Sequence, residues 1–380
     1  MAVVAVTRER HMGEPRVAIT PDAVKKLAAQ GVQVVIETGA GLTASIGDED
    51  YRAAGATIAA DLSATLRDAD ILFKVRGPVD EEIALLKRGA VVVGLLDPHQ
   101  ARPLVETLAA AGLTAFAMEF VPRISRAQAM DALSSQANLA GYRAVIEAAQ
   151  AYGRAMPMMM TAAGTIAPAK VFVMGAGVAG LQAIATARRL GAVVSATDVR
   201  AAAKEQVESL GAKFVAVEDE EFKAAETAAG YAKEMSAEYR AKQAALVSDH
   251  IRKQDIVITT ALIPGRAAPR LVSATQVASM KAGSVIVDLA VEQGGNVEGA
   301  RPDEVVVAGA GVKIVGVANL AGRIAADASA LYARNLTAFA GLLLDKEGRL
   351  TLDLDDEILK AAVITHGGVV THPALALQAA

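Results

Sequence analysis

The chain has 380 residues, a net charge of −4, no cysteine and 3% aromatic residues, while apolar residues make up 53%. This length suffices for two domains with well-filled cores. The lack of cysteine excludes disulfides, thiolate chemistry and cysteine-based zinc sites. The slightly acidic balance, without a strongly basic stripe, argues against a nucleic-acid partner. No apolar stretch approaches the roughly 20 residues that cross a bilayer, so we expect no direct membrane insertion.

Short β-branched runs alternate with helical segments along the first third, a pattern typical of α/β folds on mostly parallel sheets. We expect helices at residues 21–30, near 49–54 and at 103–111, and strands at 3–6, 32–36, 71–73, 91–94 and 114–117. An alanine-rich helix over 134–155, stopped by Pro157, is long enough to bridge two domains. The methionine-rich run 156–160 is expected to fill core space near a hinge.

A second α/β series begins at Lys170, with strands expected at 171–174, 193–197, 214–217, 256–259, 285–288 and 314–317. The polar, acidic segment 218–236 is expected to be a long mobile loop, and 321–344 another long helical stretch. We therefore predict an α/β protein of two domains, each an open, mostly parallel sheet flanked by helices. The first holds residues 1–133 and 328–380, and a Rossmann-type dinucleotide-binding domain, 134–327, is inserted into it.

The second series opens with a G-x-G-x-x-G motif formed by Gly175, Gly177 and Gly180, after an expected strand and before a helical segment at 181–190. In this context the first glycine makes a tight turn, the second lets backbone approach a pyrophosphate, and the third permits close helix–strand contact. The helix N-terminus then offers N–H groups and its dipole to phosphates. The Gly-Ala-Gly triplets at 39–41 and 309–311 lack this context and are expected to be turns.

Asp198 ends the next expected strand, eighteen residues after the last glycine. A carboxylate at this place can accept hydrogen bonds from the hydroxyls of an adenosine ribose and would repel the 2′-phosphate of NADP. Arg200 could soften that repulsion, so NAD(H) is favoured rather than forced. The alternative for Asp198 is a residue that merely forms a turn at the strand end.

An unusually polar segment, 123–131 followed by 134–142, precedes the long helix. It resembles the Arg-Gln-Asp loop in the first domain of proton-translocating NAD(P) transhydrogenases. The similarity continues in order through 158–165, 175–180, 198–200, 230–235, 260–265 and 287–292, and so covers essentially the whole chain. Alanine dehydrogenase shares the same two-domain plan and is the nearest alternative.

The resemblance implies a role for individual residues. Those expected to hold the dihydronicotinamide and its ribose are Arg123, Gln128, Asp131 and Ser134. Those expected around the rest of NAD(H) are backbone at Val178 for the pyrophosphate, Asp198, Val199 and Arg200 for the adenosine ribose, and Gly230, Gln243 and Leu262 for the adenosine half and the cleft. Tyr231 corresponds to the tyrosine of a mobile loop that folds over the nucleotide. Two simpler roles stay open, because Asp131 could cap the following helix and Arg123 could form a surface ion pair.

Acid–base chemistry distinguishes the two relatives. Similarity to alanine dehydrogenase would place Arg16 and Lys74 at a substrate carboxylate, but its catalytic histidine falls on Leu95 here, and His99 is expected in a surface loop. Its acidic partner falls on Glu292, a longer carboxylate than the usual aspartate. Hydride transfer between two nicotinamide rings needs no acid or base, only orientation and exclusion of water.

The chain shows one convincing dinucleotide fingerprint, so NADP(H) is expected on a partner subunit. The resemblance implies further partners and a location: membrane-spanning transhydrogenase subunits that couple hydride transfer to proton translocation, a homodimer, and a cytoplasmic position, peripheral on the inner face of the cell membrane. The histidines show no metal-ligand spacing, so we expect no metal site. A free NAD-dependent alanine dehydrogenase and a nonenzymatic NAD-sensing module are the alternative functions.

Overall fold

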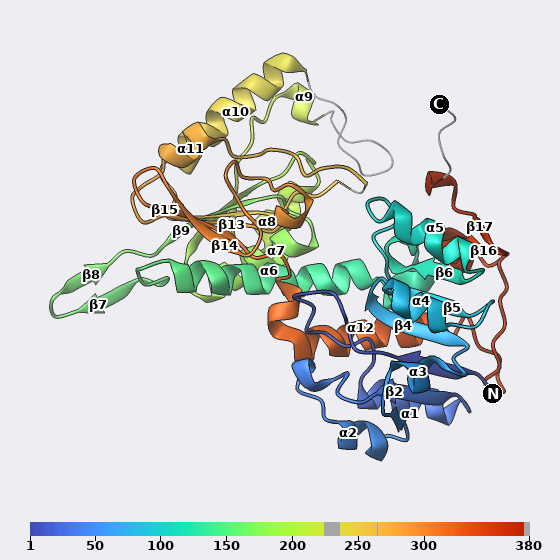
Figure 1. Cartoon of the computed structure of the whole chain (residues 1–380). Coiled ribbons are helices and arrows are strands. Elements are labelled where there is room, and N and C mark those ends of the chain that lie inside the picture. The colour runs from blue at the N-terminus through green and yellow to red at the C-terminus, as the bar shows by residue number, and fades with distance from the viewer. Residues whose placement is uncertain (224–235, 264, 376–380) are drawn as a thin grey trace. The chain divides into compact units, whose positions relative to one another are not determined.

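The computed structural model describes residues 1–223, 236–263 and 265–375. The chain divides into two compact units, each built on its own sheet (Figure 1). Unit 1 comprises Met1–Gln136 and Ala321–Ala380, and unit 2 comprises Ala137–Leu320. The boundaries expected from the sequence, after residues 133 and 327, lie a few residues from these.

The sheet of unit 1 has, in its described part, the strand order β17-β16-β6-β5-β4-β1-β2-β3. The strands from β3 to β6 pair in parallel, and β16 is antiparallel to both of its neighbours. The bounds are β1 Val3–Val6, β2 Gln33–Glu37, β3 Thr57–Ala59, β4 Ile71–Arg76, β5 Val91–Leu95, β6 Thr114–Ala117, β16 Val363–His366 and β17 Val369–Val370.

Successive side chains of these strands enter two separate cores, because neighbouring residues of a strand point to opposite faces. Val4 and Val6 pack in a cluster with α1 (Pro21–Ala29) and α12 (Ala325–Ala340). Ala5 packs in another, with α3 (Leu62–Leu66), α4 (Asp80–Leu85) and α5 (Arg102–Ala110). Two short helices complete the unit, α2 (Asp48–Ala53) and α13 (Glu357–Ala362).

The sheet of unit 2 has the order β11-β10-β9-β12-β13-β15-β14, all parallel except β14. Apart from the added β14, this is the strand order 3-2-1-4-5-6 of a Rossmann fold. The bounds are β9 Lys170–Met174, β10 Val193–Thr197, β11 Lys213–Phe214, β12 Ile256–Thr259, β13 Val285–Asp288, β14 Glu304–Ala308 and β15 Val312–Gly316. The expected α/β fold with mostly parallel sheets is confirmed in both units.

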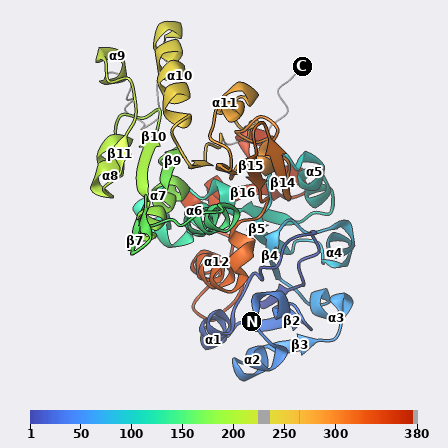
Figure 2. The ribbon, with the colours of Figure 1, turned by 90° about the vertical axis from the view of Figure 1, so that its left-hand side faces the viewer.

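Helices cover both faces of the unit 2 sheet (Figure 2). One core joins the strands to the part of α6 (Ala132–Ala151) within unit 2 and to α7 (Val178–Arg189). The other core joins them to α10 (Ala237–Ile251) and α11 (Ala274–Ala278). The short helices α8 (Ala203–Ser209) and α9 (Glu220–Lys223) complete the described part.

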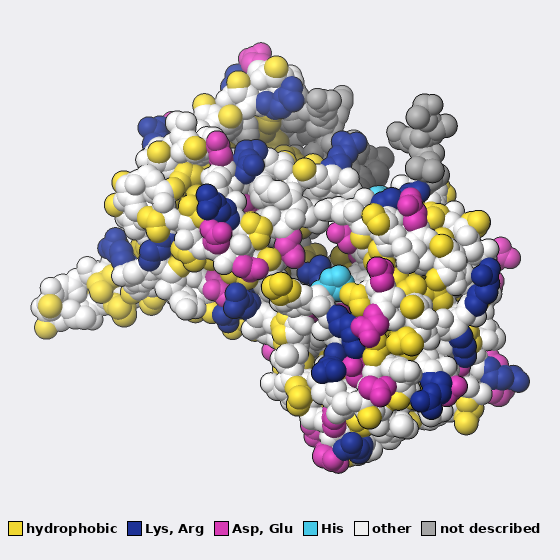
Figure 3. Space-filling model, in the orientation of Figure 1, with side chains coloured by type: hydrophobic (Ala, Val, Ile, Leu, Met, Phe, Trp, Pro, Cys, Tyr) yellow, Lys and Arg dark blue, Asp and Glu magenta, His cyan; other side chains and the backbone are white. Residues whose placement is uncertain are grey.

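Several expectations about individual segments were wrong. The methionine run is not core filler: β7 (Met159–Thr161) and β8 (Gly164–Ile166) form a separate hairpin, on which Met160 is 77% exposed. Hydrophobic side chains lie along this projecting hairpin (Figure 3). The long helix ends at Ala151 rather than residue 155, and 321–344 contains a 3₁₀ turn, Ala321–Ile324, before α12. Part of the expected mobile loop is α9, while residues 224–235 lie outside the described part.

Other expectations about turns were correct. The triplet 309–311 connects the antiparallel strands β14 and β15, and 39–41 is a turn after β2. Neither begins a helix of the kind that follows Gly180.

Candidate functional site

The glycine motif connects β9 to α7, the place where a Rossmann fold binds the phosphates of a dinucleotide. Gly175 has φ +108°, a backbone conformation that other residues rarely adopt. A Cβ on Gly180 would overlap the carbonyl oxygen of Gly175, so only glycine lets α7 lie this close to the loop. A Cβ on Gly177 would meet no atom within 4 Å, so the backbone there faces open space. Val178 begins α7 and is partly exposed.

Asp198 lies directly after β10, beside this loop. Its Oδ2 accepts a hydrogen bond from the backbone N–H of Ala176 at 2.7 Å, and both carboxylate oxygens accept from the guanidinium of Arg200 at 2.9 and 3.0 Å. Burial alone would raise the pKa of Asp198, but the bonds from Arg200 and Ala176 outweigh it and hold the pKa below its usual range. The carboxylate is therefore ionised near neutral pH.

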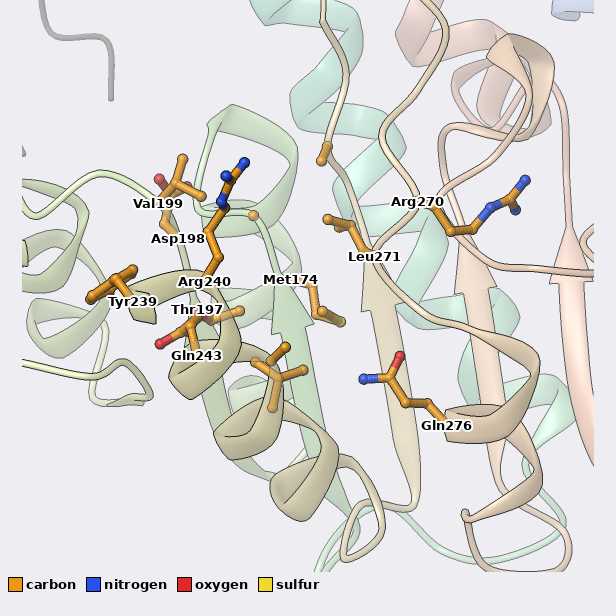
Figure 4. A pocket seen from close by; sticks show the side chains of 14 residues that line it. Met174, Thr197, Asp198, Val199, Tyr239, Arg240, Gln243, Arg270, Leu271 and Gln276 are labelled. Atoms are coloured by element: carbon orange, nitrogen blue, oxygen red, sulfur yellow. The ribbon is translucent and has the colours of Figure 1, made fainter. Parts of the chain in front are cut away.

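A cavity of about 640 Å³ opens at the carboxyl ends of β9, β10 and β12. Figure 4 shows the side chains that line it, several of them from α10 and from the segment after β12. Of the expected nucleotide residues, Gly175, Asp198, Val199 and Gln243 line this cavity. Gln243 is fixed in place, since its Oε1 accepts from the backbone N–H of Val217 and its Nε2 donates to Thr197.

The sequence analysis missed several lining residues, namely Tyr239, Arg240, Arg270, Leu271 and Gln276. They come from α10 and from residues 270–276, which form neither a motif nor a strand end, so no local pattern marks them. Met174 and Thr197, also in the lining, are the last residues of β9 and β10. These two could have been found from the rule that ligands bind at the carboxyl ends of parallel strands.

Three expected cofactor residues of unit 2 do not line the cavity. Leu262 follows the lining residue Ala261 and is 50% exposed. Gly230 and Tyr231 lie outside the described residues, so their expected contacts stay predictions.

The expected nicotinamide residues form one continuous segment of unit 1, the 3₁₀ helix Ser125–Met130 and the start of α6. The segment is anchored by its buried residues Ala127 and Met130 and by Asn335 of α12, whose side chain donates to the carbonyl of Ala129 at 2.9 Å. Arg123 and Gln128 are exposed, and their side chains have no hydrogen-bond partner among the described residues. The surface ion pair considered for Arg123 is thus not formed within that region of the chain.

Asp131 and Ser134 bond to each other at the start of α6. Asp131 accepts from the backbone N–H of Ser134 at 2.8 Å and from its hydroxyl at 2.6 Å. Asp131 therefore has the capping geometry considered for it. Capping fixes the direction of its carboxylate and does not remove it from contact with a ligand.

Arg16 and Lys74, the two cations shared with alanine dehydrogenase, are buried and paired. Arg16 donates to Glu14 at 2.6 and 2.7 Å and to the amide oxygen of Gln136 at 2.8 Å. Lys74 contacts the carboxylates of Glu82 at 3.0 Å and Glu9 at 3.4 Å. Protein carboxylates thus occupy both cations.

The position expected to hold a catalytic histidine is Leu95, the last residue of β5. His99 is exposed in the loop after it and packs edge-on against Phe120, so its expected surface-loop position is confirmed. Glu292 lies in the 3₁₀ turn Val291–Gln293 after β13.

Glu119 is a buried carboxyl group that the sequence analysis missed. It follows β6, and its Oε1 accepts from the backbone N–H of Asp97 at 2.7 Å. Its Oε2 is buried without a hydrogen-bond partner among the described residues. Burial, against weaker backbone hydrogen bonds, raises the pKa of Glu119 to about 7.

Two searches of the described residues bear on the expected ligands and partners. Their acidic and histidine side chains form no group that could hold a metal ion. None of their helices combines the length and apolarity that crossing a bilayer requires.

The chain matches two domain families along its length. Residues 5–140 match the alanine dehydrogenase/PNT N-terminal domain, and residues 144–373 match the alanine dehydrogenase/PNT C-terminal domain. The chain belongs to the alanine dehydrogenase/PNT family.

Within the alanine dehydrogenase/PNT family, the transhydrogenase subunits are much more similar to this chain than the alanine dehydrogenases. It is 55% identical to the first segment of NAD(P) transhydrogenase subunit alpha of Rhodospirillum rubrum, over 99% of this chain and 100% of that one. The crystal structure of transhydrogenase from Sinorhizobium meliloti superposes with a TM-score of 0.89 at 57% identity, covering 97% of this chain and 100% of that one. Alanine dehydrogenase of Mycolicibacterium smegmatis is 30% identical, over 98% and 96%.

Proposed function

We propose that this chain is the NAD(H)-binding subunit of a proton-translocating NAD(P) transhydrogenase, which donates hydride from NADH to NADP⁺ bound on a partner subunit. The observation that carries the proposal is the ionised Asp198 beside the glycine loop and the cavity of unit 2, a combination suited to an adenosine ribose and its pyrophosphate. The similarity to a transhydrogenase alpha chain over the full length of that chain supports it.

The cofactor supplies the hydride, so the task of the protein is to bind, orient and exclude water. On unit 2, the N–H groups at the start of α7 meet the pyrophosphate and Asp198 accepts from the ribose hydroxyls. On unit 1, Arg123 and Gln128 offer unpaired donors to the carboxamide and ribose of the nicotinamide half. The bonded pair Asp131 and Ser134 holds the same segment in shape.

The alternative, an alanine dehydrogenase, requires a proton donor and a cationic grip on a carboxylate. Leu95 supplies no proton, and Arg16 and Lys74 are already paired with protein carboxylates. The arrangement therefore favours direct hydride transfer, which needs neither group.

The partners follow from what one nucleotide site cannot do. NADP(H) is bound by another subunit, and a membrane-spanning subunit carries the protons, so this chain is cytoplasmic and peripheral on the inner face of the membrane through those subunits. The exposed methionines of the β7–β8 hairpin, Met158, Met159 and Met160, are an apolar surface suited to a second copy of the chain, which supports a homodimer.

Binding and turnover of the purified chain test this proposal. Titration should show saturable NADH binding, and incubation with pyruvate, ammonia and NADH should leave the NADH absorbance unchanged. Absence of NADH binding would reject the nucleotide site, and rapid NADH oxidation with alanine formation would instead establish the dehydrogenase.

A further inference from the structure

The carboxylate of Asp198 has no acceptor position left for a ligand. A carboxylate offers about four lone-pair positions, and four donors fill them here. Two are backbone N–H groups, of Ala176 at 2.7 Å and of Arg200 at 2.9 Å. The other two are Nε and Nη2 of the Arg200 guanidinium, at 2.9 and 3.0 Å. The hydroxyls of a ribose can bond to this carboxylate only if one of these donors leaves.

The guanidinium of Arg200 is the donor that can leave. The N–H of Ala176 belongs to the glycine loop, and the N–H of Arg200 is fixed by the turn after β10. The Arg200 side chain, in contrast, is 38% exposed and can turn into solvent, whereas Asp198 is 7% exposed. Because a buried carboxylate must keep its donors, either the guanidinium or the ribose hydroxyls must be bonded to it.

We propose that Arg200 is an internal competitor that occupies the ribose subsite at Asp198 and thereby limits the preference of this site for NADH over NADPH. The proposal rests on the function proposed above and adds what sets nucleotide selectivity. The ribose 2′-hydroxyl of NADH must displace the guanidinium from the carboxylate. A 2′-phosphate is repelled by Asp198 but can pair with the displaced guanidinium, which prefers phosphate oxygens. Arg200 thus opposes the binding of one nucleotide and assists that of the other.

Arg240 provides a matched control. It also lines the cavity, and in Figure 4 it lies beside Asp198 and Val199, yet it supplies none of the four donors described above for Asp198. Arg240→Ala and Arg200→Ala therefore remove the same charge from the same cavity, and only Arg200→Ala removes the guanidinium donors from the carboxylate.

Calorimetric titration of the full chain with NADH and, separately, with NADPH tests the proposal. Arg200→Ala should tighten NADH binding by roughly 2- to 5-fold, the value of a partly exposed ion pair. It should weaken NADPH binding by about tenfold or more, the loss of a charge-assisted hydrogen bond. Arg200→Gln should shift both affinities in the same directions. Arg240→Ala should not shift the two affinities in opposite directions.

Each other outcome is decisive. Equal weakening of both nucleotides by Arg200→Ala, or weaker NADH binding, overturns the proposal, as does an Arg240→Ala variant that reproduces the opposite shifts. If the unchanged chain binds NADH while the Arg200 variants show no opposite shifts, only this inference fails. If the unchanged chain does not bind NADH, the proposed function fails with it. Thermal unfolding of each variant verifies that the fold is kept.

Discussion

Gly180 lies so close to the carbonyl oxygen of Gly175 that a Cβ atom at position 180 would overlap it. Two residues of one motif therefore fix the distance between α7 and the loop after β9. Gly177, between them, has φ −76° and ψ −168°, a conformation open to any residue, and free space on its Cβ side. The glycines at 177 and 180 thus meet different demands, one from the fold and one from a ligand.

Alanine substitutions separate these two demands. We expect Gly180→Ala to lower the free energy of unfolding by about 1–3 kcal/mol, because α7 must move away from the loop. Gly177→Ala should leave unfolding nearly unchanged and weaken NADH binding by about tenfold or more, because its methyl group enters the space proposed for the pyrophosphate. Denaturant unfolding and calorimetry measure both effects. Normal NADH affinity in Gly177→Ala would show that the pyrophosphate does not bind against this loop.

The buried carboxyl of Glu119 should make stability depend on pH. Its pKa is about 7 in the folded chain, against an ordinary value of 4.5. The folded state therefore holds the proton more tightly, and this contribution is complete below pH 4.5 and is lost as the pH rises through 7. Glu119→Gln keeps a neutral group and should gain stability relative to the unchanged chain, by about 2–3 kcal/mol at pH 8 and close to nothing at pH 4.5. A stability difference that is the same at both pH values would contradict the assignment.

The buried cation Lys74 is expected to matter for folding rather than for substrate. Lys74→Met leaves the carboxylates of Glu9 and Glu82 without their cation, which should cost about 3–5 kcal/mol of unfolding free energy. Lys87→Met is the control, because Lys87 pairs with Asp70 at 2.6 Å on the surface, where an ion pair contributes about 1 kcal/mol or less. Chemical denaturation measures both variants. Similar small losses in the two would show that the buried network is not needed for stability.

Gln128 should act on the rate of hydride transfer and not on affinity. Shortening its side chain in Gln128→Asn displaces an exposed amide while leaving the adenosine contacts of unit 2 intact, so the rate should fall and the NADH dissociation constant should stay nearly the same. Arg126→Gln is a neighbouring control, since Arg126 pairs with Asp356 at 2.7 Å. It should leave the rate unaltered. An unchanged rate in Gln128→Asn would remove Gln128 from the residues that orient the ring.

Local patterns predicted the sheets and the glycine loop well. A strand such as β9, a glycine triplet with forced geometry and an acidic strand end are all set by neighbours in sequence. The hairpin at Met159 was misread, because an apolar run looks the same whether it is buried or projects from a unit. The cavity residues Tyr239 and Arg270 could not be found, since only tertiary packing brings them to Asp198.

Charge state and pairing were also beyond the sequence. Glu119 follows a strand like many turn residues, and its raised pKa arises from burial that no local pattern reports. The sequence indicated that Arg200 could moderate the charge of Asp198. It did not indicate that the two side chains bond so fully that a ribose must compete for the carboxylate.

The central claim is direct hydride transfer from NADH on this chain to NADP⁺ on a partner. It is tested most directly by mixing the chain, loaded with NADH deuterated at C4 on the transferred side, with an NADP⁺-loaded transhydrogenase subunit and analysing the product by mass spectrometry. We predict NADPH that carries the deuterium without loss to water, formed only when both proteins are present. Unlabelled NADPH, or no NADPH from two proteins that each bind their nucleotide, would contradict the claim.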